Sequence, residues 1–297
     1  MAEKIIIDTD PAVGVPLRDV DDALAILYLL ALPDEFEVLG ITAVGGNAPV
    51  PSAYAKARGL VGLARRGDVP VYKGAAKAGC EGSAAGSFLA RAVDERPGEV
   101  TVLAIGPLSN LRQASLLDPE FYSKVKRVVA MGGALAREVN LPLLFPLEFN
   151  FFKDPDAAEG LLAAPCEKVI ITGDLCRQAL FTRRELEALF GLGSAVGTWL
   201  AYRVRPWLRL NQLFPFVPWK EGFVPWDVVA AVYLRRPGLF ADIETKGMRL
   251  RPGRLRTGAI EPDASRDAMP ATLPARQDAD AMLSEFLEVM VRYPLPT

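Results

Sequence analysis

The stretch Ile5-Ile6-Ile7-Asp8-Thr9-Asp10-Pro11, continued by Asp21-Asp22-Ala23-Leu24-Ala25-Ile26, decides the fold of this chain. The apolar β-branched run predicts a buried strand that ends at the first aspartate. The second part opens with two acids and continues with apolar residues, which predicts a helix. Carboxylates at the exit of a strand and at the start of the next helix can converge on one point. Their charges repel unless a hard divalent cation neutralises them, so the stretch predicts a site for Ca²⁺ or Mg²⁺.

A structural explanation competes for the acids near the start of the helix. Asp19, Asp21 and Asp22 can cap free N–H groups there and interact favourably with the helix dipole. That explanation does not extend to Asp8 and Asp10, which follow an apolar strand. Residue chemistry alone therefore favours metal binding.

Apolar strand-like runs alternate with helical patterns through the first two thirds of the chain. The alternation predicts a mostly parallel, open α/β sheet with helices on both faces and a Rossmann-like core. We expect a single domain over residues 1–297. The predicted strands are Lys4–Ile7, Val38–Val44, Val69–Tyr72, Val100–Ile105, Val125–Met131 and Lys168–Thr172, and the predicted helices are 21–32, 51–64, 87–93, 108–116, 155–162 and 182–188.

The last third is less regular in sequence. We expect an irregular, aromatic-rich segment over 206–225 and a helix over 227–234. The Pro- and charge-rich segment 251–275 predicts loops or a small hairpin, and 276–293 predicts a closing helix.

The composition excludes several classes of function. The chain contains no histidine, which removes Ser-His-Asp hydrolases and His-ligated zinc enzymes. A formal net charge of −2 gives no basic excess for binding nucleic acid or an anionic membrane. The run Ile5–Ile7 is too short for a signal segment, and no stretch predicts a membrane span. The three cysteines are widely spaced, so we expect reduced thiols and a cytoplasmic enzyme.

One alternative uses the same aspartates for phosphoryl transfer. Haloacid-dehalogenase-like enzymes also begin with Asp-x-Asp after a first strand, and they require a downstream Gly-Asp-x-x-x-Asp. Here Gly173-Asp174 is present, but Gln178 stands where the second aspartate of that motif is required. Such enzymes also have no use for the pair Asp21-Asp22. This alternative ranks below the next one.

Further motifs follow the aspartates in order along the chain. Each alone has little specificity. Together they span about residues 4–240 and resemble the inosine–uridine nucleoside hydrolase family, which opens with Asp-x-Asp-Pro-Gly-x-Asp-Asp on a strand, loop and helix. The motifs after the first are Val44-Gly45-Gly46-Asn47, Ile105-Gly106-Pro107-Leu108-Ser109-Asn110, Val128-Val129-Ala130-Met131-Gly132-Gly133, Glu148-Phe149-Asn150, Asp154-Pro155-Asp156 and Trp226-Asp227.

The resemblance implies a nucleoside-hydrolase-like fold and Ca²⁺-dependent hydrolysis of a nucleoside to ribose and free base, as in purine and pyrimidine salvage. By similarity, Asp10, Asp22, Asp227 and the carbonyl of Ile105 would hold the ion. Asp10 would also be the catalytic base, and Asp8 would support it. Contacts to substrate would come from Asp21, Asn47, Met131, Asn140, Glu148, Asn150 and Trp226. Relatives are usually homodimers or homotetramers, so the same is expected here.

Two departures from the family pattern bear directly on the predicted aspartate site and on the base. Many relatives carry His directly before the last aspartate ligand, whereas this chain carries Trp226. Aromatic stacking is attributed to purine-preferring relatives, so the tryptophan favours a purine base, although core packing explains it equally well. An insertion over Gly14–Val20 separates the two halves of the aspartate motif. The missing histidine also leaves open a nucleoside- or ribose-binding relative without catalysis.

Overall fold

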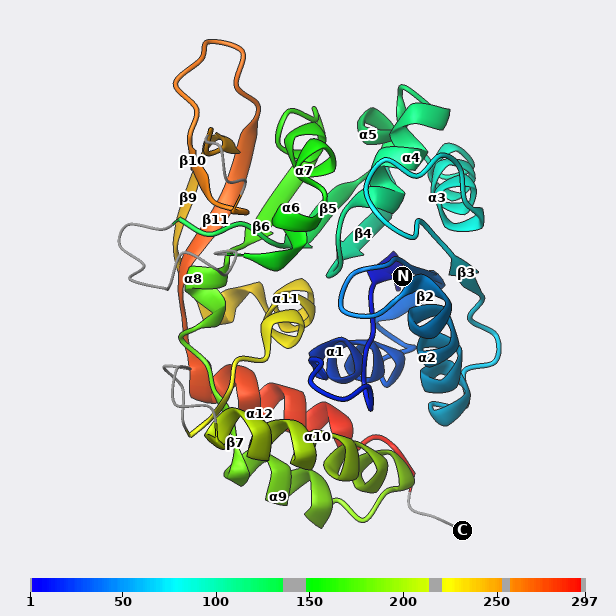
Figure 1. Cartoon of the computed structure of the whole chain (residues 1–297), viewed down its shortest axis with the longest axis vertical. Helices are drawn as coiled ribbons and strands as arrows, with labels where there is room; N and C mark the ends of the chain where they lie inside the picture. The colour runs from blue at the N-terminus through cyan, green and yellow to red at the C-terminus, as the bar shows by residue number, and fades with distance from the viewer. Residues whose placement is uncertain (1, 136–147, 214–220, 253–256, 295–297) are drawn as a thin grey trace.

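The computed structural model describes residues 2–135, 148–213, 221–252 and 257–294. Within these ranges one sheet contains nine strands in the order β10-β9-β11-β6-β5-β4-β1-β2-β3 (Figure 1). Strands β1 to β6 pair in parallel, β11 joins β6 in parallel, and β9 and β10 are antiparallel, so the predicted mostly parallel α/β sheet is confirmed. The strands are β1 (Glu3–Thr9), β2 (Phe36–Ala43), β3 (Val71–Lys73), β4 (Val100–Ala104), β5 (Arg127–Met131), β6 (Glu167–Ile171), β9 (Phe240–Leu250), β10 (Ile260–Pro262) and β11 (Pro270–Gln277).

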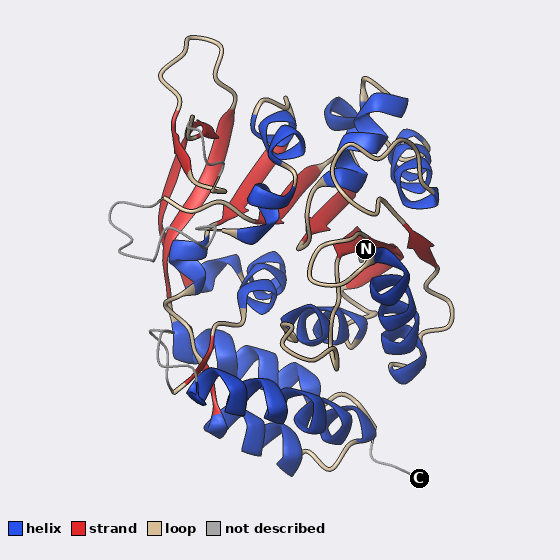
Figure 2. Ribbon diagram, in the orientation of Figure 1, coloured by secondary structure: helices blue, strands red, loops and turns tan. Residues whose placement is uncertain are grey.

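Helices cover both faces of this sheet, as predicted (Figure 2). Successive side chains of a strand point to opposite faces, so Ile5 and Ile7 join one core and Ile6 joins the other. The first core includes residues of α1 (Asp21–Leu30), α2 (Val50–Leu63), α11 (Trp226–Arg235) and α12 (Ala279–Met290). The second includes residues of α3 (Ala84–Asp94), α4 (Ser109–Leu117), α5 (Phe121–Lys124) and α7 (Pro155–Leu162).

Shorter elements complete the described structure. Helices α9 (Arg183–Gly191) and α10 (Ala195–Leu213) add buried residues to the first core, as does the small hairpin of β7 (Phe181–Thr182) and β8 (Gly222–Phe223). Single turns α6 (Phe149–Lys153) and α8 (Gly173–Cys176) follow β5 and β6 along the chain, and the 3-10 turn Pro237–Leu239 precedes β9. Among the described residues, no helix combines the length and apolar character needed to cross a membrane.

The irregular segment predicted over 206–225 is wrong for its first part. Helix α10 continues through Pro206 to Leu213. Leu200, Val204 and Leu208 recur at a spacing of four residues and are buried against the first core. We infer that this apolar stripe outweighs the cost of a proline in a helix interior, which is about 3 kcal/mol.

The loops or small hairpin predicted over 251–275 are also partly wrong. Strand β11 occupies 270–277 and pairs with the long strand β9, which the sequence did not predict. Only Phe240 and Met248 of β9 are buried because the strand lies toward the outer end of the sheet, so it lacks the apolar run of the inner strands. The closing helix is present but begins at Ala279, where the Asp278 side chain accepts a hydrogen bond from the Ala281 N–H.

Candidate functional site

Three buried aspartates meet at the N-terminal ends of α1 and α11. Asp21 and Asp22 open α1, and Asp227 is the second residue of α11. One carboxylate oxygen from each lies within 4.8 Å of the others. The main-chain N–H of Asp227 donates to Oδ2 of Asp21 at 3.1 Å, which ties the two helix starts together. Residues about 200 positions apart thus form one oxygen-rich group.

The end of β1 places Asp10 and Asp8 beside these three aspartates. The Asp10 N–H donates to Oδ1 of Asp22 at 3.0 Å, and Oδ2 of Asp10 accepts from the Asn47 N–H at 2.5 Å. A Cβ at Gly46 would stand 2.0 Å from Oδ2 of Asp10, so only glycine permits this close approach. Oδ1 of Asp8 accepts hydrogen bonds from the Thr42 hydroxyl and the Asn110 side-chain amide, which hold this carboxylate in place.

The carboxylates of this site strongly disfavour one another's charge. Burial and then the charge of Asp22 raise the pKa of Asp10 well above its ordinary value. Burial, Asp21 and Asp22 do the same to the pKa of Asp227. Burial and then Asp21 raise the pKa of Asp22 to about 7. In the described part of the chain, no Lys or Arg forms an ion pair with any of these aspartates.

Three buried carboxylate oxygens in the site also lack hydrogen bonds. Oδ2 of Asp8, Oδ1 of Asp10 and Oδ2 of Asp22 have no donor among the described residues. An unsatisfied buried carboxylate oxygen is costly unless it coordinates a cation. The donor set contains only oxygen, which suits Ca²⁺ or Mg²⁺ and fits the predicted metal site.

The expected sugar-contact residues gather beside the ends of β4 and β5. Asn150 Nδ2 donates to the carbonyls of Ile105 (3.2 Å) and Met131 (3.1 Å). Glu148 caps α6 by accepting from the Asn150 and Phe151 N–H groups, and it accepts from the Gly133 N–H at 2.9 Å. These are the turn bonds that a purely structural role predicts, but they also hold a buried carboxylate whose pKa burial raises to about 7.

Other expected residues take different places. Asp21, expected at the sugar, belongs to the group of three close carboxylates, whereas Asp10, expected as a ligand, lies outside that group and beside it. Asn47 is half-buried and holds Asp10 through its main chain. Asn140 lies outside the described residues.

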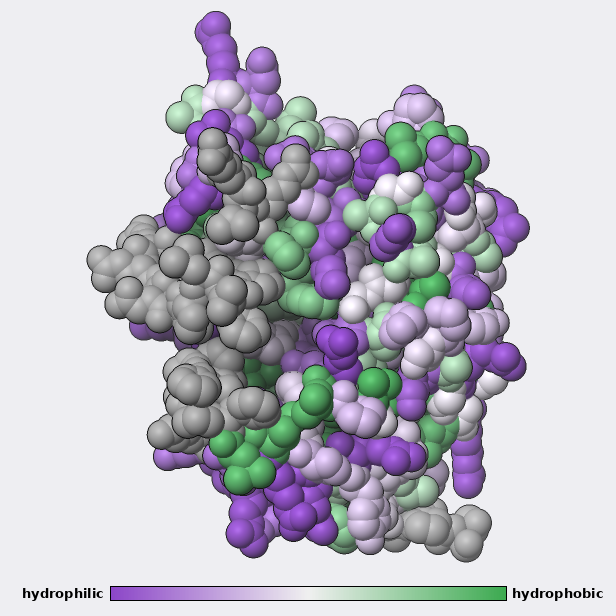
Figure 3. Space-filling view, viewed as in Figure 1, coloured by the Kyte–Doolittle hydropathy of each residue, from purple (hydrophilic) through white to green (hydrophobic). Residues whose placement is uncertain are grey.

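The structure adds Arg177, a residue that sequence reasoning missed, to the site. Trp226 is partly exposed and opens α11 directly before Asp227, and the guanidinium carbon of Arg177 lies 5.5 Å from the centroid of its ring. Arg177 follows α8, at the end of β6, and that position was the one available signal. Figure 3 shows a shaded hollow near the centre of the same face, in the region where Figure 1 places α11 and the loop before α1.

Known proteins resemble this chain in sequence and in fold. The family described as inosine-uridine preferring nucleoside hydrolase matches residues 5–266. Uridine nucleosidase 1 of Arabidopsis thaliana is 34% identical over 269 residues, covering 81% of this chain and 74% of that protein. A solved plant nucleoside hydrolase superposes with a TM-score of 0.86 at 24% identity, over 98% of this chain and 99% of its own. A purine-preferring ribonucleoside hydrolase from Gardnerella vaginalis gives 0.85 at 24% identity, over 97% of this chain and 98% of its own.

Proposed function

Because the chain belongs to the inosine-uridine preferring nucleoside hydrolase family, we propose that it hydrolyses the N-glycosidic bond of ribonucleosides with Ca²⁺ as cofactor. The observation that carries the proposal is the set of buried carboxylates that lies within 4.8 Å without a cationic partner among the described residues. An arrangement that repels itself so strongly is explained by a ligand of opposite charge.

The residues that would hold Ca²⁺ are Asp10, Asp22, Asp227 and the Ile105 carbonyl. The unpartnered oxygens of Asp10 and Asp22 support the first two, and the closeness of Asp22 to Asp227 supports the third. The Ile105 carbonyl accepts from Asn150 and has a second lone pair available. When bound, the ion would neutralise the carboxylates and lower the pKa of a nearby water.

The chain's own groups then divide the work of hydrolysis. Asp10 takes a proton from the water that attacks C1′, because its Oδ1 is buried and free to accept one. Asp21, Asn47, Asn140, Glu148 and Asn150 grip the ribose hydroxyls beside Met131, and that binding orients C1′ toward the water. Positive charge that develops on the sugar is stabilised by the surrounding carboxylates.

The choice of base rests on Trp226. Its ring is partly exposed beside Asp227, where it can stack on a purine. The Gardnerella vaginalis neighbour is named for purine preference, whereas the Arabidopsis thaliana relative is named for uridine. We propose a purine ribonucleoside as the better substrate, with uridine as the comparison substrate.

The test is the release of reducing sugar from a panel of nucleosides. Purified protein with Ca²⁺ is expected to release ribose from inosine and guanosine faster than from uridine, and excess chelator is expected to stop all release. Asp10→Ala should be inactive with each substrate. Absence of turnover with every nucleoside, alongside retained ribose binding, would identify a binding protein and overturn the proposal.

A further inference from the structure

The guanidinium of Arg177 lies beside Trp226, the aromatic residue of the candidate base site. Its central carbon lies 5.5 Å from the centroid of the Trp226 ring, which is cation–π range. Its Nη1 lies 3.7 Å from Oδ1 of Asp174, and the other oxygen of Asp174 accepts from the Leu135 N–H. The aromatic ring and the acid hold the guanidinium between the ends of β5 and β6.

The position of this cation relates it directly to the acidic site. A Cβ added at Gly173 would lie 3.7 Å from Nη2 of Arg177, from Cζ3 of Trp226 and from the Gly133 carbonyl oxygen. The N–H of the same Gly133 donates to Glu148, and the residue after Trp226 is Asp227. Arg177 therefore lies between Gly133, which binds Glu148, and the start of the helix that carries Asp227.

Cys176 lies directly before Arg177, and its Sγ atom contacts the Trp226 carbonyl at 3.6 Å. Burial raises the pKa of this thiol, and the charges of Asp21 and Glu148 raise it further, while the charge of Arg177 lowers it. The charges of Asp21, Glu148 and Arg177 thus all act on this one buried thiol.

The turn that carries Arg177 is fastened to β11 by three hydrogen bonds. The Gln178 side chain donates to the Ala275 carbonyl and accepts from the Gln277 N–H. Gln277 in turn donates to the Leu175 carbonyl at 2.7 Å. A turn held this firmly to β11 keeps a charged group in one place, which electrostatic stabilisation of a transition state requires.

The reaction has a chemical need that this residue can meet. The C1′–N bond breaks with its electron pair left on the ring nitrogen, so the base departs as an anion. The chain has no histidine to protonate that anion. An arginine remains charged and gives up no proton, but its N–H groups donate strong hydrogen bonds to anionic acceptors.

We propose that Arg177, held against Trp226, stabilises the departing base through hydrogen bonds to an acceptor nitrogen or carbonyl oxygen on it. This proposal rests on the proposed function and adds the group that assists the leaving base. The attacking water forms the new C1′–O bond and gives its proton to Asp10, and the base anion takes its proton from solvent afterwards. Bases whose anion carries a hydrogen-bond acceptor beside the broken bond are the class that benefits.

The test compares two leaving groups in the variant Arg177→Gln. On inosine or uridine, kcat is expected to fall about 10²-fold, whereas on p-nitrophenyl riboside, whose anion leaves without help, it should change by less than about threefold. Arg177→Lys keeps a charge and should recover part of the loss on the nucleosides. Arg205→Gln removes a guanidinium stacked near Phe190 and Tyr202 and should leave both substrates unchanged.

The outcomes separate this proposal from the one it rests on. A wild-type protein that hydrolyses neither nucleosides nor the nitrophenyl riboside overturns the proposed function itself. An active wild type with equal loss on both kinds of substrate in Arg177→Gln assigns the residue a structural role and overturns this proposal alone. Unchanged activity on both substrates overturns it as well.

Discussion

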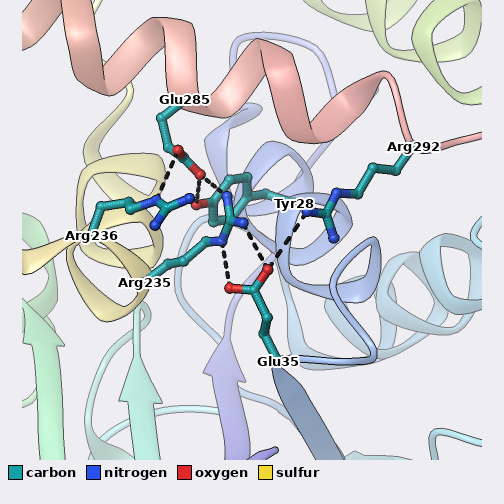
Figure 4. Close-up of polar contacts among 6 residues, drawn as sticks. All are labelled: Tyr28, Glu35, Arg235, Arg236, Glu285 and Arg292. Atoms are coloured by element: carbon teal, nitrogen blue, oxygen red, sulfur yellow. Dashed lines mark hydrogen bonds and ion pairs between the residues drawn. The ribbon is translucent and has the colours of Figure 1, made fainter.

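The N-terminal and C-terminal ends of the neighbouring helices α1 and α11 differ in whether their charged side chains are paired. At their N-terminal ends, buried aspartates face one another, and no Lys or Arg of the described residues pairs with them. At the C-terminal end of α11, Arg235 and Arg236 meet Glu35 and Glu285, with Tyr28 of α1 and Arg292 joining them (Figure 4). We call this second group the arginine–glutamate network.

The network satisfies its charges, whereas the aspartate group does not. Hydrogen bonds from Arg235 lower the pKa of Glu35. Burial would raise the pKa of Glu285, but hydrogen bonds from Arg236, Tyr28 and Arg235 outweigh it and leave that pKa below its ordinary value. In the aspartate group, every pKa is raised instead. Matched charges stabilise a fold, and unmatched buried charges of one sign indicate a site whose partner is a ligand.

The largest expected effect comes from Asp10→Asn. The variant keeps the acceptor for the Asn47 N–H but loses the proton acceptor, so kcat should fall by about 10³-fold. The metal-depleted variant should also melt at a higher temperature than metal-depleted wild type, because one repelling charge is gone. Ribose release and thermal unfolding in chelator measure the two effects. A variant that loses activity and also melts lower would show that Asp10 stabilises the fold and does not strain it.

Disrupting the arginine–glutamate network should lower the stability of the fold and leave the activity unchanged. Glu285→Gln leaves Arg235 and Arg236 without their shared carboxylate and should lower the free energy of unfolding by about 2 kcal/mol, less than for a fully buried pair because Arg236 is half exposed. Its kcat should equal that of wild type. Glu288→Gln, at an exposed position of the same helix, is the matched control for urea unfolding. A loss of kcat in Glu285→Gln would contradict the proposal that the arginine–glutamate network stabilises the fold and takes no part in the reaction.

The smallest expected effect is a difference in pH dependence between the two regions, measured as melting temperature in chelator. Asp22 and Asp8 have folded pKa values of about 7, above their unfolded values near 4, so the folded state binds more protons between these limits. Stability of the metal-depleted protein should therefore rise as pH falls from 8 to about 5.

The arginine–glutamate network should lose its contribution to stability as the pH falls further. The folded pKa values of Glu35 and Glu285 are lowered, so their contribution is present above the unfolded pKa and is lost as pH falls through the folded values. Below about pH 4 stability should therefore drop, and the drop should be smaller in Glu285→Gln. A melting temperature that falls steadily from pH 8 downward would contradict the assignment of strain to the aspartates.

The inner sheet could be predicted from sequence because its parallel strands β1, β4, β5 and β6 are buried on both faces along most of their length. Runs such as Ile5–Ile7 and Val128–Met131 are continuous and apolar, and they end at the residues of the site. Strand β9 escaped prediction because its exposed positions carry Asp242, Glu244 and Arg249, which do not indicate a strand. Local patterns describe the inner strands well and describe strands near the edge of a sheet poorly.

The site could be anticipated in its members more than in its geometry. Asp21, Asp22 and Asp227 were expected near one another, but the order of motifs does not say which carboxylate points at which neighbour. The structure draws Asp21 into the group of three and places Asp10 beside it. Arg177 lies 49 positions before Trp226, and only the path of the chain brings them together.

The most direct test of the central claim is a calorimetric titration of the chelator-treated protein with Ca²⁺, in wild type and in Asp227→Asn. If the unmatched aspartates exist to hold a metal, wild type should bind one ion, and the loss of one carboxylate should weaken binding by at least about 100-fold. Wild type without measurable binding of Ca²⁺, or a variant that binds it as tightly as wild type does, would contradict the account.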